Sequence, residues 1–415
     1  MEIQEEPRQG ARLFVTLAAM YFACGFVAQF AAQGVGLFLR DAGAASGLVG
    51  LLYVAAIPYT LRFVWAPIVD RMRPAEGPRF RPWVIGSQVA TCLVLAAMAF
   101  LDPAASGGLI VLGVAALMIA LGTQTVALGG LMIEGLPRND YPTGAAIKAG
   151  ASAAAGLVLG AVVLYLLADL GWSVVVGALL TVSVVLLLVA AFALDFGPRV
   201  DSETPPSLLA QFSVFARPGP RALFVVSILL SMAALLPYAG KSVLLIDAGF
   251  TVAQGGLIGI VLGSACGVLG ALAARMAIPR LGAFGVLTAL GAGNLAVALG
   301  LAFALRDGMS APAVVAGVLW ASFAVFATFT ANRSLLMPLC RPGRQATEMA
   351  TFASLEAIVF LAVAGGALAL LDRIGITLLL STMAAITFAG LIFVRLTAQT
   401  LSADQVAPVQ EAVPE

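Results

Sequence analysis

Long apolar runs, separated by short polar segments, fill almost the whole chain. A helix needs about 20 apolar residues to cross the hydrocarbon core of a bilayer, and these runs reach that length. The first run is too long for the apolar core of a signal peptide, so we expect it to remain as a span. The pattern predicts twelve transmembrane helices, near residues 13–39, 47–69, 82–101, 107–133, 144–168, 172–194, 221–246, 253–276, 281–305, 311–337, 347–371 and 374–396.

The longest polar segment, from Asp195 to Pro220, divides these spans into two sets of six. The predicted fold is therefore an all-α integral membrane protein with two six-helix, pseudo-symmetric bundles. A faint internal repeat agrees with this division, because Asp-Ala-Gly occurs at 41–43 and again at 247–249. We expect an N-terminal half at 1–195, a central cytoplasmic loop at 196–220, a C-terminal half at 221–397 and a disordered cytoplasmic tail at 398–415.

Positive charges are unevenly distributed between the two ends of the predicted spans. If the N-terminus lies in the cytoplasm, seventeen of the 22 lysines and arginines fall on the cytoplasmic side. Arg40, Arg306 and Arg373 fall on the other side, while Arg62 and Lys241 lie within spans. Loops rich in lysine and arginine stay in the cytoplasm when a membrane protein inserts. The bias predicts a multi-pass protein with both termini in the cytoplasm.

Composition excludes several classes of function. Hydrophobic residues make up 61% of the chain and charged residues 10%, whereas a soluble domain has about 25% charged residues. The net charge is +1, and there is no basic arm that would bind nucleic acid. With no histidine, the chain cannot perform histidine-based catalysis or hold a histidine-ligated metal. The four scattered cysteines are typical of buried free thiols. We therefore expect no enzyme activity, no cofactor and no metal site.

The segment LRFVWAPIVDR, from Leu61 to Arg71, combines charges with an apolar run. Arg62 lies within the run, Asp70 and Arg71 close it, and further arginines follow. Asp-Arg with a basic cluster after the second span resembles the loop between helices 2 and 3 of the major facilitator superfamily. The usual Gly-x-Leu before the aspartate is replaced here by Ala-Pro-Ile-Val, at 66–69.

Four segments together resemble one branch of that superfamily: YFACG at 21–25, LRDAG at 39–43, IPYTLRFVWAPIVDR at 57–71 and EGLPRNDYPTGAAIKAGASAAAGLVLG at 134–160. They are similar to the permeases related to the muropeptide transporter AmpG, and most closely to the RhtX/FptX siderophore importers. In the second half the resemblance depends mainly on PGRQATEMATFASLEA, at 342–357. Two positions differ: Cys24 stands where many relatives carry glutamine, and Lys148 replaces an uncharged polar residue. The resemblance implies the major facilitator fold, a bacterial inner-membrane location and proton-coupled transport.

Polar side chains within the predicted spans are the candidates for substrate binding. A charge at bilayer depth is costly, so it is expected to face a cavity or a partner. Each candidate also has a plainer explanation: hydrogen bonds between helices for the amides, packing for the rings and snorkelling to the surface for the lysines. The candidates are Tyr21, Gln29, Gln33, Tyr59, Arg62, Gln124, Lys148, Lys241, Asn332 and Glu356.

Glu356 is the deepest charge. It follows Thr347, where its span begins, by nine residues, which puts it roughly 14 Å into the membrane at 1.5 Å per residue. Arg62 lies eight residues before Asp70, at a depth of about 12 Å on the same arithmetic. Helices 2 and 11 are neighbours in the superfamily fold, so the resemblance allows Arg62 and Glu356 to meet, and whether they pair stays open. The alternative to a binding role is an ion pair that only joins the halves.

Asp70 and Arg71 are the candidates for gating. A carboxylate can face the N-terminus of a partner helix, where the helix dipole favours an anion. In the superfamily this contact forms when the transporter faces outward and breaks when it opens inward. Since the chain has no histidine, the candidates for proton coupling are the carboxylates Glu134 and Glu356, if burial raises their pKa.

The sequence thus favours an inner-membrane secondary transporter that imports a siderophore, as its iron complex such as ferric pyochelin, by alternating access. The alternative in the same fold is a permease or exporter of muropeptides or other amphipathic small molecules. A membrane-embedded enzyme is a third hypothesis, against which the missing histidine counts. The expected partners are the small-molecule substrate and the lipid bilayer, and the expected state is a monomer.

Overall fold

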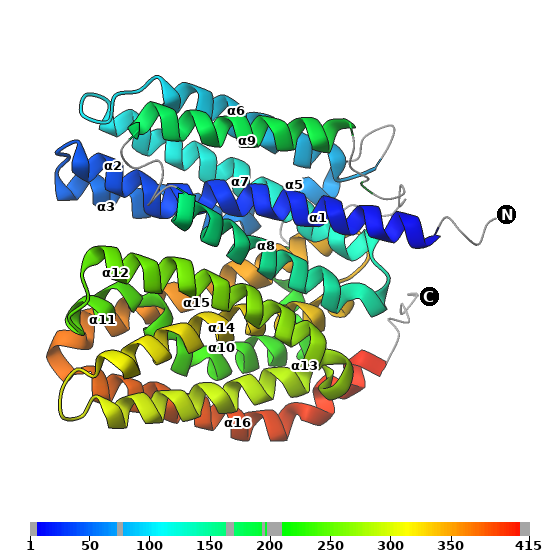
Figure 1. The fold of residues 1–415 in the computed structure, drawn as a ribbon. Coiled ribbons are helices and arrows are strands. Elements are labelled where there is room, and N and C mark those ends of the chain that lie inside the picture. Colours follow the sequence, from blue (N-terminus) through cyan, green and yellow to red (C-terminus); the bar gives the residue numbers. More distant parts are fainter. Residues whose placement is uncertain (1–5, 73–77, 163–169, 193–195, 197–209, 407–415) are drawn as a thin grey trace.

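The computed structural model describes residues 6–72, 78–162, 170–192, 196 and 210–406. All regular structure in these ranges is helical, and Figure 1 shows the helices lying side by side in two groups that follow the order of the chain. The N-terminal half contains α1 (Glu6–Gln29), η1 (Phe30–Gly34), α2 (Val35–Asp41), α3 (Ser46–Ala55), α4 (Ile57–Thr60), η2 (Arg62–Val64), α5 (Ala66–Arg71), α6 (Arg81–Ala99), α7 (Gly107–Gly135), η3 (Arg138–Asp140), α8 (Tyr141–Val162) and α9 (Trp172–Phe192). The C-terminal half contains η6 (Ala210–Ala216), α10 (Pro218–Ala239), α11 (Lys241–Asp247), α12 (Val252–Gly256), η7 (Leu257–Leu262), α13 (Gly263–Ala304), α14 (Ala311–Leu336), η8 (Met337–Leu339), α15 (Gln345–Ile374) and α16 (Ile376–Val406).

Eleven helical segments in the described ranges are long and apolar enough to cross a membrane. One of them, Ala253–Ala304, has 52 residues, about twice what a bilayer requires. It bends at Gly282, whose φ of 70° and ψ of 155° are not helical. Glycine tolerates this positive φ because it has no Cβ. The bend turns the segment into two crossings, which agrees with the predicted spans at 253–276 and 281–305.

The second predicted span is broken into short pieces. Pro58 and Pro67 each occupy the first turn of a new helix, α4 and α5, because proline has no N–H to offer to a preceding turn. Between them, η2 is a single 3-10 turn that carries Arg62. The helix is thus interrupted just before Pro67, and the breaks place Arg62 and Asp70 on different helical pieces.

The two halves meet through a few helices. From the N-terminal half α8 packs on α13 and α14, and from the C-terminal half α15 packs on α5 and α7. Small residues allow the close approach of α8: a Cβ on Gly156 would lie 2.9 Å from Ser264 Oγ, and one on Gly160 would lie 2.8 Å from the Ile260 side chain.

We call the end where α1 begins and α16 ends the basic end, and the opposite end the far end (right and left in Figure 1). At the basic end η6 lies in the predicted central loop, where Phe215 stacks against Phe352 with ring centroids 6.0 Å apart. α16 continues to Val406, so helix extends into the segment predicted to be disordered; residues 407–415 lie outside the described ranges.

Candidate functional site

A cavity of about 440 Å3 lies between the two halves. α4, η2, α7 and α8 line it from the N-terminal half, and α10, α14 and α15 line it from the other. Its surface is mainly apolar and aromatic, and its charged groups are few. The lining includes Tyr59, Arg62, Lys148, Phe329, Arg333 and Glu356.

Glu356 is held by three donors from its own half. Its Oε1 accepts hydrogen bonds from Ser227 Oγ at 2.6 Å and Asn332 Nδ2 at 2.7 Å, and its Oε2 lies 2.5 Å from Arg333 Nη2. Ser227 is on α10 and the other two donors are on α14. Both members of the ion pair are buried, with 2% of Glu356 and 7% of Arg333 side chain exposed. The pair of Glu356 with Arg62 that the resemblance allowed is therefore not formed, because Arg333 occupies that position.

Arg62 lines the same cavity without a carboxylate partner. It donates from Nη1 to the Tyr59 carbonyl oxygen at 2.8 Å, and its guanidinium carbon lies 4.5 Å from the centroid of the Tyr59 ring. Among the described residues no ion pair of Arg62 occurs. Arg62 therefore places a buried positive charge at the cavity, and the hydrogen bond to the Tyr59 carbonyl oxygen holds its side chain in position.

Lys148, on α8, adds a third cation. Its Nζ lies 5.4 Å from the centroid of the Tyr21 ring, so Tyr21 is placed behind Lys148 and outside the cavity lining. Arg333 Nη1 has no hydrogen-bond partner among the described residues, although the same side chain lines the cavity. The guanidinium groups of Arg62 and Arg333 already outnumber the single carboxylate, Glu356, so the cavity lining carries a net positive charge, which favours an anionic ligand.

The other predicted binding residues have structural contacts. Gln124 is fully buried and donates from Nε2 to Gln88 Oε1 at 3.0 Å, so it joins α7 to α6. Asn332 serves as a donor to Glu356 and to Ser227. Lys241 lies 5.3 Å from the centroid of the Tyr238 ring and does not line the cavity.

Two glutamines complete this set. Gln29 lies at the contact of α1 with α8, where its Nε2 would be 3.1 Å from a Cβ on Gly156, and it does not line the cavity. Gln33 falls among the side chains that the structure leaves undescribed.

A second buried charge cluster joins the two halves on the side of the basic end; we call it the latch, formed by Asp70, Arg79, Glu134, Gly343 and Thr347. Asp70 Oδ2 accepts hydrogen bonds from the backbone N–H of Thr347 at 2.7 Å and from its hydroxyl at 2.6 Å. Thr347 is the third residue of α15, so the carboxylate caps the N-terminus of a helix from the opposite half. The structure thus contains the contact that the charge argument predicted.

Arg79 links the parts of the latch. Its Nη2 lies 3.2 Å from Asp70 Oδ1, its Nη1 lies 2.5 Å from Glu134 Oε1, and Nη2 also donates to the Gly343 carbonyl oxygen at 3.4 Å. Burial raises the pKa of Asp70 to about 6, although the Thr347 donors and the Arg79 charge oppose the rise. Glu134 therefore belongs to the latch and not to the cavity, and Arg71 is exposed beside it.

Sequence reasoning missed Arg333 beside the cavity, Thr347 in the latch and a further buried ion-pair cluster around Glu348. Arg333 follows the polar Asn332 within an apolar run, and these two adjacent polar residues were the signal in the sequence for a buried polar cluster. Thr347 and Glu348 lie in the segment PGRQATEMATFASLEA that carried the family resemblance. Glu348 is an acid in the first turn of α15, where it pairs with Arg217 at 2.6 Å and Arg341 at 2.7 Å.

Comparisons with known proteins agree with this architecture. A sequence profile of the family described as acetyl-coenzyme A transporter 1 matches residues 13–127. An uncharacterized protein of Haemophilus influenzae is 33% identical over 145 residues, which are 34% of each chain. The anhydromuropeptide permease of Escherichia coli is 26% identical over 324 residues, covering 75% of this chain and 64% of that one. The matched segments thus span about a third and just under two thirds of these relatives.

Solved structures share the fold over nearly the whole length. The human organic anion transporter MFSD10 superposes with a TM-score of 0.70 at 17% identity, covering 94% of this chain and 99% of that chain. The major facilitator superfamily transporter FucP, in its outward conformation, gives a TM-score of 0.68 at 16% identity, covering 92% and 98%. The chain has the major facilitator fold, which confirms the predicted fold class. The relation to permeases of the AmpG type is supported as well.

Proposed function

We propose that the chain is a secondary transporter that carries a small organic anion through the cavity by alternating access. The observation that carries the proposal is the placement of Arg62, Lys148 and Arg333 around a cavity between the halves in which Glu356 is the one carboxylate among the described lining residues. A buried charge that has no protein counter-ion is expensive unless a ligand provides one. The fold offers a reason for such a site, because substrates of these transporters bind between the two halves.

The substrate class we favour is a muropeptide of the anhydro type. The named relative with the longest match here is an anhydromuropeptide permease. A muropeptide joins sugar rings to a short peptide, so it carries carboxylates together with large weakly polar faces. The cations suit the carboxylates, and the rings of Tyr59, Tyr238 and Phe329 suit the sugar faces.

A ferric siderophore is the second candidate. It is supported by the resemblance of the segments at 57–71 and 134–160 to siderophore importers. A chelate that bears a carboxylate would use the same cations. Import of such a complex remains distinguishable from muropeptide import only by direct measurement of uptake.

The latch provides the gate in this proposal. While Asp70 caps α15, the two halves are joined at the basic end and the cavity is closed there. Opening that end separates α5 from α15 and exposes Asp70 to water, which replaces the lost donors. By the positive-inside rule the basic end is cytoplasmic, so opening the latch would release substrate into the cell. We place the protein, as a monomer, in the bacterial inner membrane with both termini in the cytoplasm.

The Arg333–Glu356 pair is the candidate for coupling to protons. If Glu356 takes up a proton, Arg333 loses its counter-ion and becomes available to a substrate carboxylate. Proton and substrate would then bind together, as a symporter requires. Glu134 lies in the latch, where a proton would act on the gate and not on substrate binding.

The test is uptake into proteoliposomes that contain the purified chain. We expect a radiolabelled anhydromuropeptide tripeptide to accumulate when a proton gradient is imposed and to stop doing so in the Arg62→Met variant. Arg373→Met is the matched control, because Arg373 is an exposed cation at the far end. Accumulation of a ferric siderophore and not of the muropeptide would establish the second candidate. Failure of every anionic solute would overturn the role of the cavity.

A further inference from the structure

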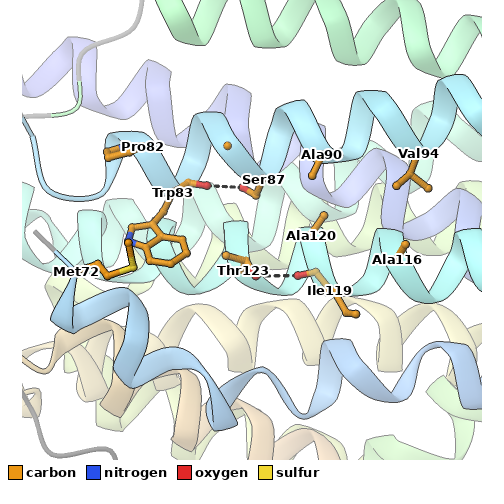
Figure 2. Close-up of a pocket in the computed structure, with 11 residues that line it drawn as sticks. Met72, Pro82, Trp83, Ser87, Ala90, Val94, Ala116, Ile119, Ala120 and Thr123 are labelled. Carbon is orange, nitrogen blue, oxygen red and sulfur yellow. Dashed lines mark hydrogen bonds between the residues drawn. The ribbon is translucent and has the colours of Figure 1, made fainter. Parts of the chain in front are cut away.

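A second hollow lies away from the cavity, on the outer face of the N-terminal half. It is a groove of about 700 Å3 between α6 and α7. Small residues create it: Gly86 and Ala90 on α6 face Ala116 and Ala120 on α7. Figure 2 shows Met72 and Trp83 at one end of the groove and Val94 toward the other. Because it lies among spans of a membrane protein, the groove faces the acyl chains of the bilayer.

The hydroxyl groups in the groove wall are already satisfied by the protein. Ser87 Oγ donates to the Trp83 carbonyl oxygen at 2.7 Å, and Thr123 Oγ1 donates to the Ile119 carbonyl oxygen at 2.9 Å (Figure 2). Thr123 Oγ1 also accepts a hydrogen bond from Trp65 Nε1 at 3.1 Å. A polar solute would therefore find few partners, whereas an apolar chain loses nothing by entering.

The end of the groove nearest the basic end is positively charged. Arg71 directly precedes Met72, Arg81 directly precedes Pro82, and both arginines are exposed. Arg81 donates from Nη2 to the Ala191 carbonyl oxygen at 2.8 Å, which holds that nitrogen against the end of α9, and Arg71 has no ion pair among the described residues. The neighbouring acid, Asp70, is fully buried in the latch and does not neutralise them.

We propose that this groove binds one phospholipid with an anionic headgroup. An acyl chain lies between α6 and α7, and the headgroup phosphate meets Arg71 and Arg81. Basic side chains at the surface end of such a groove attract anionic lipids. The site is distinct from the transport cavity and does not depend on the substrate. Since Met72 is two residues from Asp70, the bound lipid touches the segment that carries the latch.

The test uses the fluorescence of Trp83 as a local probe. The chain is reconstituted in phosphatidylcholine vesicles that contain a minor fraction of a brominated lipid, either phosphatidylglycerol or phosphatidylcholine. Bromine quenches tryptophan only in near contact, and subtracting the signal of a Trp83→Phe variant isolates Trp83. We expect brominated phosphatidylglycerol to quench Trp83 about twofold more than brominated phosphatidylcholine at equal fraction, because the arginines concentrate the anionic lipid.

Variants locate the site. Gly86→Leu fills the groove without a clash, since a Cβ there has no neighbour within 4 Å, and it should remove the excess quenching. The matched control is Gly177→Leu, because Gly177 is likewise the sixth residue of its helix and has no neighbour within 4 Å. The double change Arg71→Gln and Arg81→Gln should make the quenching of Trp83 by the two lipids equal. This variant leaves the groove itself intact, so it tests the site even if Gly86→Leu fails to fold.

Three results would overturn the proposal. Equal quenching of the original chain by both lipids would mean ordinary boundary lipid without a site. Excess quenching that survives Gly86→Leu would place the anionic lipid elsewhere. Absence of quenching by either lipid, together with a doubled particle mass, would mean that a second copy of the chain covers the groove.

Discussion

The two buried carboxylates of this molecule are stabilised in opposite ways. Glu356 finds all its donors, Ser227, Asn332 and Arg333, inside its own half. Asp70 divides its contacts between Arg79 in its own half and Thr347 in the other. A cluster inside one half can persist when the halves move, whereas a cluster across both must break. The contacts of Glu356 can therefore persist in every state of the transporter. The contacts of Asp70 exist only while the halves are joined at the basic end.

The largest effect should come from the cluster inside one half. Arg333→Met and Glu356→Gln each leave a buried partner unpaired, at a cost of roughly 3–5 kcal/mol of unfolding free energy. The double variant should recover most of that loss. Thermal unfolding of the purified variants measures it, with Arg62→Met as the control that breaks no ion pair. Losses that simply add in the double variant would mean that the two residues are not coupled.

Asp70→Asn should affect transport more than folding. The amide lacks the charge that favours the helix N-terminus, while Arg79 keeps Glu134 as a partner and is not stranded. We expect uptake to slow about tenfold, which corresponds to about 1.4 kcal/mol, with normal abundance in the membrane. Asp307→Asn is the control, since Asp307 is 83% exposed. Unchanged uptake would remove Asp70 from the gate.

A smaller change at the same contact tests whether the Thr347 hydroxyl helps to hold the two halves together. Thr347→Val removes the hydroxyl donor to Asp70 and keeps the backbone donor, at a cost of about 1 kcal/mol, whereas Thr347→Ser keeps both donors. Spin labels at Met72 and Pro342, both exposed beside the latch, should show a larger separated population for valine than for serine. The labels require a variant without the four native cysteines. Equal populations would show that the hydroxyl does not hold the halves together.

The smallest expected effect concerns pH. Because burial raises the pKa of Asp70 to about 6 from its ordinary 3.8, the folded chain binds this proton more tightly than the unfolded chain. The resulting stabilisation is full below the ordinary value and is lost as pH rises through about 6. The stability of the original chain relative to Asp70→Asn should therefore increase by roughly 1 kcal/mol between pH 7.5 and pH 5.5. A difference independent of pH, in thermal unfolding at both values, would contradict the raised pKa.

Much of the fold could be predicted from the sequence. A helix must have about 20 apolar residues to cross a bilayer, so the lengths of the apolar runs indicate the spans. The contact of Asp70 with the N-terminus of α15 was also predictable, because the dipole of a helix favours a carboxylate at its N-terminus. The sequence did not show how each helix is rotated about its own axis, and therefore which of its side chains face the cavity. α7 is apolar on all sides, so its pattern does not tell whether Gln124 faces the cavity or α6.

The wrong partner for Glu356 has a related cause. Counting residues gives depth along the span, and Arg62 and Glu356 do lie at similar depth and line one cavity. The predicted span 311–337 puts Arg333 only four residues from the end of its helix. In the structure η8 continues α14 to Leu339, so Arg333 lies about two turns inside, and its long side chain reaches Glu356.

The bend of α13 at Gly282 has a mechanical consequence. On either side of this residue the backbone hydrogen bonds of two crossings run without an intervening loop. A helix is stiff along its axis, so a tilt of the first arm is passed to the second through a single residue. Any change in the angle between the two arms therefore has to be accommodated at Gly282. A side chain larger than hydrogen at position 282 would strain the elbow through its positive φ, even though the surrounding space is open.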